Sequence, residues 1–295
     1  MILTIMHPLV DACSMSVLAS GGLSWQRILV YNALAFALQL PLGVLIDARP
    51  RIARGVFVVG TCLVCAATLA AACGADGWGV IAAVCIGNAV FHLTAGKHVL
   101  ETHGGRSGPI GLFISTGALG LLAGQLGAEH AAKVCMPTFA ALLAACVAVA
   151  PGMNGRDARS PSATGGTPVL PVVVLVGLFM LVAWRSWAGL EASRLTAEEG
   201  MVLLLAGAVV TWGGKAVGGY LAERIGRWTV TAASVCGSVT MAFACSPQNV
   251  LAWLALLFVA QLATGPVISL VYDNMGKRGG AAFGLNCLGL FAGSL

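Results

Sequence analysis

Long runs without a charged side chain constrain most strongly what this chain can fold into. One run extends from Trp228 to Tyr272 without Asp, Glu, Lys or Arg, which is more than one helix needs to cross a lipid bilayer. Hydrophobic residues make up 58% of the 295 residues and charged residues 9%, whereas a soluble domain typically carries about 25% charged residues. Because lipid offers the backbone no hydrogen-bond partners, the sequence predicts an all-α, polytopic membrane protein.

The charge-free runs predict about eleven membrane spans, since each span takes roughly 20 apolar residues. Segment 153–168, MNGRDARSPSATGGTP, is polar and rich in Gly, Ser and Pro, so it predicts a flexible cytoplasmic linker. We therefore expect an N-terminal six-helix bundle at 1–152 and a C-terminal bundle of five spans at 169–295. The chain ends at Leu295 inside an apolar stretch, which we interpret as a truncated sequence that lacks the last helix; the alternative is a natural protein of eleven spans. The expected spans are 2–20, 28–46, 55–75, 78–96, 108–128, 134–152, 169–190, 201–222, 228–245, 250–272 and 280–295.

The distribution of Lys and Arg predicts the orientation. With the N-terminus in the cytoplasm, the segments on the inner side carry eleven Lys and Arg residues and those on the outer side carry three. Positive charge concentrates on the cytoplasmic side of membrane proteins, so we expect a cytoplasmic N-terminus. The first span is not typical of a cleaved signal peptide, because no basic segment precedes it and Asp11 interrupts it.

A short repeat follows the second and the eighth expected spans. Residues 43–51 read GVLIDARPR, and residues 219–227 read GYLAERIGR, 176 positions later. Each copy has a glycine, three apolar residues, a carboxylate and clustered arginines on the predicted inner face. The pair resembles motif A of the major facilitator superfamily, G-x-x-x-D-R-x-G-R-[RK]. Glu223 replaces the Asp in the second copy, and Ala48 and Pro50 replace the first Arg and the Gly in the first copy.

This resemblance implies two six-helix bundles around a central cavity, related by an axis along the membrane normal. It also implies a cytoplasmic gate, in which glycines let helices approach and a carboxylate pairs with Arg and with a helix N-terminus. The alternative is that these charges only enforce the topology. The expected gate residues are Gly43, Asp47, Arg51, Gly219, Glu223, Arg224 and Arg227.

Two shorter segments, Phe91-His92 and Arg185-Ser186-Trp187, resemble the fosmidomycin-resistance type of bacterial efflux proteins. The likeness implies a monomer in the bacterial inner membrane that exchanges a small organic solute for protons. The antiporter signature of the superfamily's fifth span, spaced glycines followed by a Gly-Pro pair, is not reproduced, since Gly117, Gly120, Gly124 and Gly127 are present but no proline follows them.

Ionisable groups inside spans are the candidates for coupling, because placing them in lipid costs a few kcal/mol or more. Asp11 lies near the middle of the first span, and His7 lies one turn earlier on the same face. A buried carboxylate beside a histidine can load and release protons, so we expect a proton-coupling or substrate site here. The alternative is a structural pair that binds neighbouring helices.

The second half offers two cations inside its spans. Arg185 lies on the seventh span, which lines the cavity in this superfamily, so it is expected to hold an anionic substrate or to pair with Asp11. The alternative is an Arg that snorkels to the outer interface. Lys215 is expected to pair with a carboxylate, to reach the inner surface or to contact substrate. His92 favours a packing or gate role over ligand binding. Other polar side chains, which line the cavity or bond neighbouring helices, are Asn32, Gln39, Gln125, Gln261 and Asn286.

The sequence favours transport over the other function classes. It has no P-loop, GxSxG or HExxH motif, so we predict no enzyme, no cofactor and no nucleic-acid partner. Cys62 and Cys65 form a CxxC pair without a second pair at ligand spacing, so no metal site is predicted. The expected function is secondary active transport by alternating access, as proton-coupled efflux across the inner membrane. The alternatives are proton-coupled uptake of an anionic metabolite, a non-transporting membrane sensor and an inactive fragment.

Overall fold

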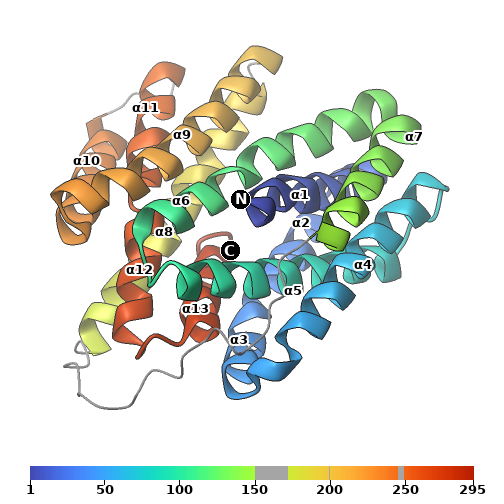
Figure 1. Cartoon of the computed structure of the whole chain (residues 1–295). Helices are drawn as coiled ribbons and strands as arrows, with labels where there is room; N and C mark the ends of the chain where they lie inside the picture. Colours follow the sequence, from blue (N-terminus) through green and yellow to red (C-terminus); the bar gives the residue numbers. More distant parts are fainter. Residues whose placement is uncertain (150–171, 199, 245–248) are drawn as a thin grey trace.

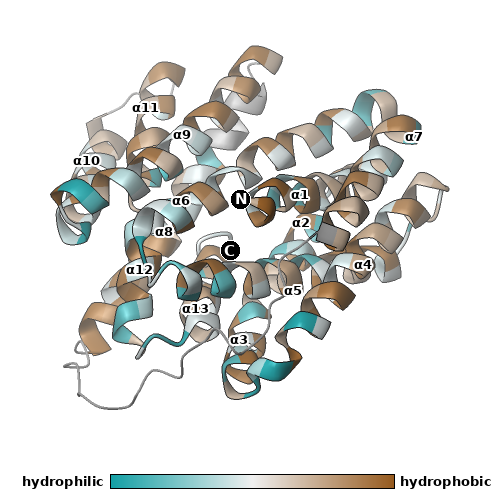
Figure 2. Cartoon of the chain, in the orientation of Figure 1, coloured by the Kyte–Doolittle hydropathy of each residue, from teal (hydrophilic) through white to brown (hydrophobic). Residues whose placement is uncertain are grey.

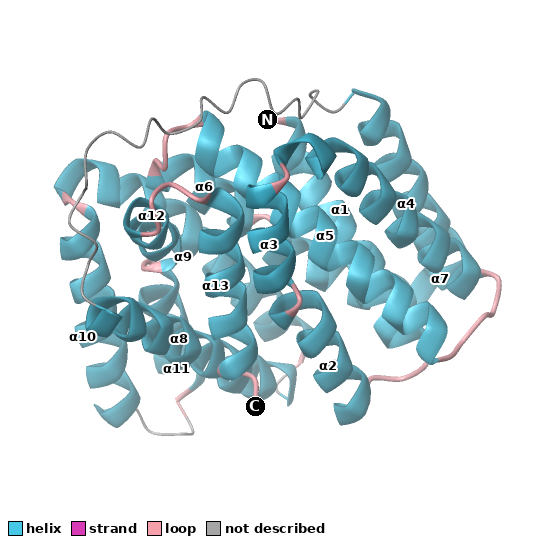
Figure 3. Cartoon of the chain, turned by 90° about the horizontal axis from the view of Figure 1, so that it is seen from below, coloured by secondary structure: helices cyan, strands magenta, loops and turns pink. Residues whose placement is uncertain are grey.

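The computed structural model describes residues 1–149, 172–198, 200–244 and 249–295, so the predicted linker at 153–168 lies outside the described residues. Within the described ranges all regular structure is helical, as Figure 3 shows. The elements are α1 (Ile2–Ser20), α2 (Trp25–Asn32), the π-helical turn η1 (Ala33–Ala37), α3 (Gln39–Ala48), the 3-10 turn η2 (Pro50–Ile52), α4 (Ala53–Ala72), α5 (Trp78–Thr102), α6 (Ser107–Ser115), α7 (Gly117–Val149), α8 (Val172–Glu198), α9 (Met201–Ile225), α10 (Arg227–Ala244), α11 (Val250–Gln261), α12 (Thr264–Asn274) and α13 (Gly279–Ala292).

The lengths and hydropathy of the helices confirm a multi-pass membrane protein. Eight helical segments of the described chain are long and apolar enough to cross a membrane. One of them, Ser107–Ala148, has 42 residues, which at 1.5 Å per residue is about twice the thickness of the hydrocarbon core. Figure 2 shows hydrophobic colours along most of the helices and hydrophilic colours gathered near several helix ends. The count of eleven spans stays a prediction.

Four expected spans depart from single straight helices. The second is divided into α2, η1 and α3, and the π turn has no signal in the apolar pattern. The fifth and sixth form α6 and α7, which are separated at Thr116, and α7 turns at Ala131, whose φ of −152° and ψ of 43° are not helical. The tenth is divided into α11 and α12.

Several helices continue past the charge-free runs that predict them, among them α3, α5, α8 and α9. Helix α5 continues to Thr102, so Lys97 lies inside it rather than in a loop, and α9 continues through Glu223 to Ile225. The carboxylates of both repeat copies therefore lie in the last turns of helices, since Asp47 belongs to α3. A charge ends an apolar run without ending the helix, because a charged side chain near a helix end can reach the membrane surface.

Helices from the first half of the chain pack directly on helices from the second half. Helix α6 packs on α9 and α12, and α13 packs on α3 and α5. Figure 1 shows α8 to α12 on the left, α1, α4 and α7 on the right, and α5 across the middle of the molecule. The exact division into two bundles stays a prediction.

Glycines on α7 bring this helix against α1. A methyl group on Gly120 would lie 2.6 Å from the Cα of Pro8, and one on Gly124 would lie 2.9 Å from the carbonyl carbon of Ala12. Both distances are too short for a side chain, so glycine is required at this crossing. The hydroxyl of Ser16 donates to the carbonyl of Gly124 at 3.2 Å. This close packing holds the face of α1 that carries His7 and Asp11.

Candidate functional site

Three titratable side chains meet inside the first half of the chain. His7 Nε2 lies 3.3 Å from Asp11 Oδ2, and His92 Nε2 lies 3.3 Å from Asp11 Oδ1. The three residues are 3%, 6% and 8% exposed. The structure places His7 beside Asp11 as their spacing predicts, and it adds His92 from α5.

Neighbouring groups orient each member of this cluster. Asn88 donates its amide N–H to Asp11 Oδ1 at 3.2 Å and to the hydroxyl of Ser14 at 3.0 Å. The Nδ1 atom of His7 lies 2.5 Å from the carbonyl oxygen of Phe113, and that of His92 lies 2.9 Å from the carbonyl oxygen of Asn88. The rings of His7 and His92 meet edge to face at 4.5 Å between centroids. Both imidazoles therefore point Nε2 at the same carboxylate.

Gly117 at the start of α7 leaves room for the cluster. A methyl group on Gly117 would lie 2.9 Å from Cε1 of His7 and would overlap the Asp11 carboxylate. Any larger residue would push at least one of these side chains out of its position.

Arg185 lies in the second half and does not pair with Asp11. Its guanidinium donates to the hydroxyl of Thr264 and to Gln261 Oε1, the latter at 3.4 Å. The residue is 5% exposed, and no carboxylate of the described residues lies within 4.0 Å of its guanidinium. The alternative that Arg185 reaches the outer interface does not fit this burial.

Among the described residues, no hydrogen bond or ion pair joins Lys215 or Asn32 to the cluster. In the part of the chain that the structure describes, Lys215 forms no ion pair, so the predicted pairing with a carboxylate is not observed. Its charge interacts with those of Asp11 and Arg185 through space. Asn32 is buried at the end of α2, and no described hydrogen bond joins it to the cluster.

The first repeat copy binds the start of α13. Asp47 accepts hydrogen bonds from the backbone N–H groups of Gly280 at 2.9 Å and Ala281 at 2.8 Å. A methyl group on Gly280 would lie 2.5 Å from the carbonyl oxygen of Gly43, so the two helices touch backbone to backbone. Lys97 adds an ion pair with Asp47 at 2.8 Å. A carboxylate at a helix N-terminus satisfies orphan N–H groups and favours the positive end of the helix dipole.

The second repeat copy makes the equivalent contact with α6. Glu223 accepts from the backbone N–H of Gly108 at 2.9 Å and from the guanidinium of Arg106 at 2.5 Å. The hydrogen bond to Glu223 raises the pKa of Arg106 above its usual value. A methyl group on Gly219 would lie 2.5 Å from the carbonyl oxygen of Ser107. Each carboxylate therefore joins its own half of the chain to a helix start in the other half.

The arginines of the two copies differ in their partners. Arg227 pairs with Asp273 and donates to the carbonyl of Gly105 at 2.9 Å. The position equivalent to Asp273, 176 residues earlier, is Lys97, which cannot accept from Arg51. Among the described residues Arg51 and Arg224 form no ion pair, so their predicted gate contacts are not observed here.

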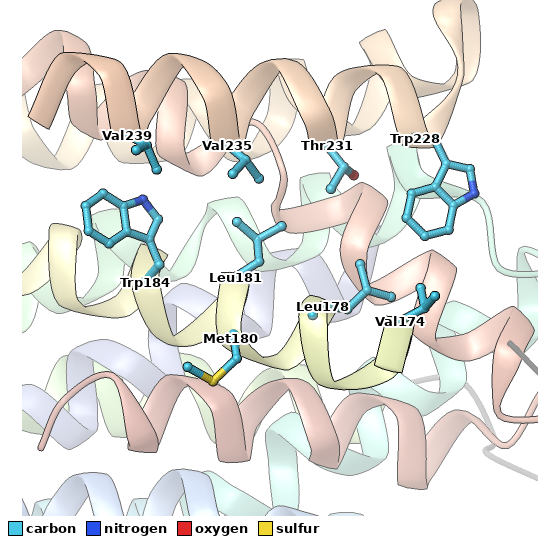
Figure 4. Close-up of a pocket in the computed structure, with 10 residues that line it drawn as sticks. Val174, Leu178, Met180, Leu181, Trp184, Trp228, Thr231, Val235 and Val239 are labelled. Atoms are coloured by element: carbon cyan, nitrogen blue, oxygen red, sulfur yellow. The ribbon is translucent and has the colours of Figure 1, made fainter. Parts of the chain in front are cut away.

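A separate cavity of about 510 Å³ lies between α8 and α10. Figure 4 shows its lining, in which Trp184 and Trp228 are the largest side chains and Thr231 contributes a hydroxyl among aliphatic groups. The indole N–H of Trp184 is already bonded to Ser238 at 3.1 Å. None of the expected site residues lines this cavity, which suits an apolar chain rather than a charged solute.

Several residues that take part in these contacts were not predicted from the sequence, although the spacing of some of them pointed to their roles. Asn88 lies four residues before His92, and Lys97 lies four residues before Glu101, with which it pairs. Residues four apart share a helix face, so the first pair could be predicted within the expected span 78–96, whereas the second requires α5 to continue to Thr102. Arg106 carries no such signal, because its partner lies 117 residues later.

Comparison with sequence families and with curated protein sequences finds no match. Solved structures do match over 99% of this chain. The E. coli fucose:proton symporter, FucP, matches with a TM-score of 0.62 at 13% identity over 88% of its own chain. A second structure of FucP, described as a major facilitator superfamily transporter in the outward conformation, matches with a TM-score of 0.61 at 14% identity over 89% of its chain. An outward-facing bacterial homologue of the iron transporter ferroportin matches with a TM-score of 0.50 at 17% identity over 88% of its chain. The chain therefore has the fold of major facilitator superfamily transporters.

Proposed function

We propose that this protein is a secondary active transporter that moves a small organic solute across a bacterial inner membrane by alternating access. The observation that carries the proposal is the pair of contacts at Asp47 and Glu223. Each carboxylate binds the N-terminus of a helix from the other half of the chain. Hydrogen bonds to a charged group contribute about 1.5–3 kcal/mol each, which is the size of a reversible conformational preference.

The two contacts are made by equivalent residues of the repeat, so in our proposal they lie at the same end of the molecule. That end is the cytoplasmic one in our proposal, because it carries most of the Lys and Arg residues. The present arrangement then has its cytoplasmic side closed. Breaking both contacts opens that side, while the glycine crossings at Gly43 and Gly219 let the helices pack again on closure.

We propose a proton as the coupling ion and the cluster of His7, Asp11 and His92 as its binding region. The cluster carries the only carboxylate in contact with two imidazoles among the described residues. We propose export as the direction, because the segments Phe91-His92 and Arg185-Ser186-Trp187 resemble those of efflux proteins. The protein acts as a monomer in this scheme, with the N-terminus in the cytoplasm.

Proton flux in inverted membrane vesicles tests this proposal. Vesicles acidified inside would hold the wild type, Asp11→Asn or Asp76→Asn and receive a panel of cationic, neutral and anionic solutes. Asp76 is a suitable control because it lies in a loop away from the cluster, where its carboxylate pairs with Arg27. We expect solute-dependent alkalinisation with the wild type and Asp76→Asn and its loss with Asp11→Asn. Absence of flux with every solute, in protein shown to be folded and inserted, contradicts the proposal and favours a sensor or an inactive fragment.

Uptake of an anionic metabolite is a second candidate. Arg185 and Lys215 are cations without a carboxylate partner in the described ranges, and an unpaired cation inside a bundle favours an anionic solute. Right-side-out vesicles distinguish the two directions. Accumulation of an anion with the wild type, lost with Arg185→Gln and kept with Arg27→Gln, supports uptake over export.

A further inference from the structure

The acceptor atoms of His7, Asp11 and His92 converge on one point. Their ligand atoms all lie within 4.8 Å of one another, and no other group of three such residues does so in the described part of the chain. The three ligand residues come from two helices, α1 and α5, and all three are buried. Two imidazoles and one carboxylate form a ligand set that suits divalent zinc, iron, nickel or copper rather than magnesium or calcium.

The outer hydrogen bonds determine which ring nitrogen carries the hydrogen. The Nδ1 atoms of His7 and His92 face backbone carbonyl oxygens, which only accept hydrogen bonds. Each Nδ1 therefore carries a hydrogen, and in a neutral imidazole Nε2 is then left with a lone pair. Both lone pairs face the oxygens of Asp11. Acceptors that face one another without a hydrogen between them repel, so this arrangement needs a positive charge between them, which either a proton on an imidazole or a metal ion supplies.

The distances fit a metal ion. Zinc binds imidazole nitrogen at about 2.0–2.1 Å and carboxylate oxygen at about 2.0–2.2 Å in a tetrahedron, so neighbouring ligand atoms lie about 3.3–3.5 Å apart. The two separations between a histidine Nε2 and an Asp11 oxygen are both 3.3 Å.

The surroundings match the outer contacts of protein metal sites. A metal-binding histidine usually donates its second ring N–H to a carbonyl or carboxylate, which holds the ring in place. Both rings do so here, and Asn88 holds the carboxylate with its amide N–H. Three protein ligands leave a fourth position for water or another ligand, as in sites where the metal exchanges or reacts.

We infer that His7 Nε2, His92 Nε2 and the carboxylate of Asp11 bind a single divalent transition-metal ion. Binding does not require transport, so the inference does not depend on the proposed function. A bound metal and a coupling proton would exclude each other, since both occupy the same acceptors.

Zinc binding to the purified, tag-free protein in detergent tests the inference. A chromophoric chelator competes for Zn²⁺, and His7→Gln, His92→Gln and Asp11→Asn are compared with the wild type. His130→Gln is the matched control, because His130 is exposed on α7. We expect one Zn²⁺ per wild-type chain, unchanged in His130→Gln. Loss of an outer contact weakens metal sites by about 10- to 100-fold, so loss of a direct ligand is expected to weaken binding by about 100-fold or more.

A readout independent of variant folding uses cobalt and X-ray absorption. Wild-type protein with Co²⁺ is expected to show a shell of nitrogen and oxygen with two imidazoles and no thiolate absorption. His92→Cys keeps three ligands, so it is expected to bind the metal and to gain thiolate absorption. A sulfur shell in the wild type, no stoichiometric binding, or equal affinity in the cluster variants and the control overturns the inference. Flux without zinc binding contradicts this inference alone, and zinc binding without flux contradicts the proposed function alone.

Discussion

We expect Asp47→Asn to weaken the contact between α3 and α13 and to expose the buried thiol of Cys287. Asp47 accepts two backbone N–H groups across the two halves, at 2.9 and 2.8 Å. Asparagine keeps one oxygen and loses the charge. It therefore loses one bond of about 1.5–3 kcal/mol and a helix-dipole contribution of about 0.3–1 kcal/mol. Lys97 retains Glu101 as a partner, so the variant leaves no unpaired lysine.

The closed contact should lose about 2–4 kcal/mol in total, which shifts the ratio of closed to open molecules by about 30- to 1000-fold. Cys287 on α13 reports this shift, because it is 5% exposed and its thiol lies 3.2 Å from Gln39 Oε1 at the start of α3. Reaction with a membrane-permeant maleimide, resolved by peptide mass spectrometry, measures the rate at that thiol. We expect the rate at Cys287 to rise at least about tenfold in Asp47→Asn.

Two controls make the result specific. Cys13 is buried in the first half, so its rate should stay constant unless the variant unfolds. Glu129→Gln removes an exposed carboxylate that only bonds Gln125 at 3.0 Å and should leave Cys287 protected. An unchanged rate at Cys287 in folded Asp47→Asn protein would refute the reasoning that this carboxylate closes the gate.

Three further predictions follow from the same contacts. Glu223→Gln should weaken the contact between α6 and α9 by a similar free energy, so amide hydrogen exchange at the start of α6 should be faster than in the wild type. Exchange at the wild-type rate contradicts this prediction. Gly43→Ala should lower the melting temperature in detergent through overpacking of about 1–3 kcal/mol, whereas Gly55→Ala, which has open space, should not. Gly117→Ala should displace the Asp11 carboxylate and abolish solute-dependent proton flux while the protein still inserts. Wild-type flux in that variant argues against the cluster as the coupling region.

The likeness of the two repeat copies could be predicted from the sequence, because both the residue types and their 176-residue spacing are properties of the sequence itself. The expectation that a carboxylate binds a helix N-terminus also came from the motif, and Asp47 and Glu223 both make such contacts. The asymmetry of the arginines was not foreseen. It depends on Lys97 and Asp273, which are 176 residues apart and carry opposite charge, and the ion pair between Arg227 and Asp273 is seen only in the folded chain.

The membrane class and the helical content were determined by the sequence alone, because burial in lipid requires apolar runs and internally bonded backbone. The position of His7 one turn from Asp11 was also local. Tertiary packing decided that His92 joins them, since that requires α5 to lie against α1 and glycines to admit α7 beside both. It also decided that Arg185 meets Thr264 rather than Asp11. Contacts between distant segments depend on how helices cross, and crossings depend on the shapes of whole helix faces, which no single residue encodes.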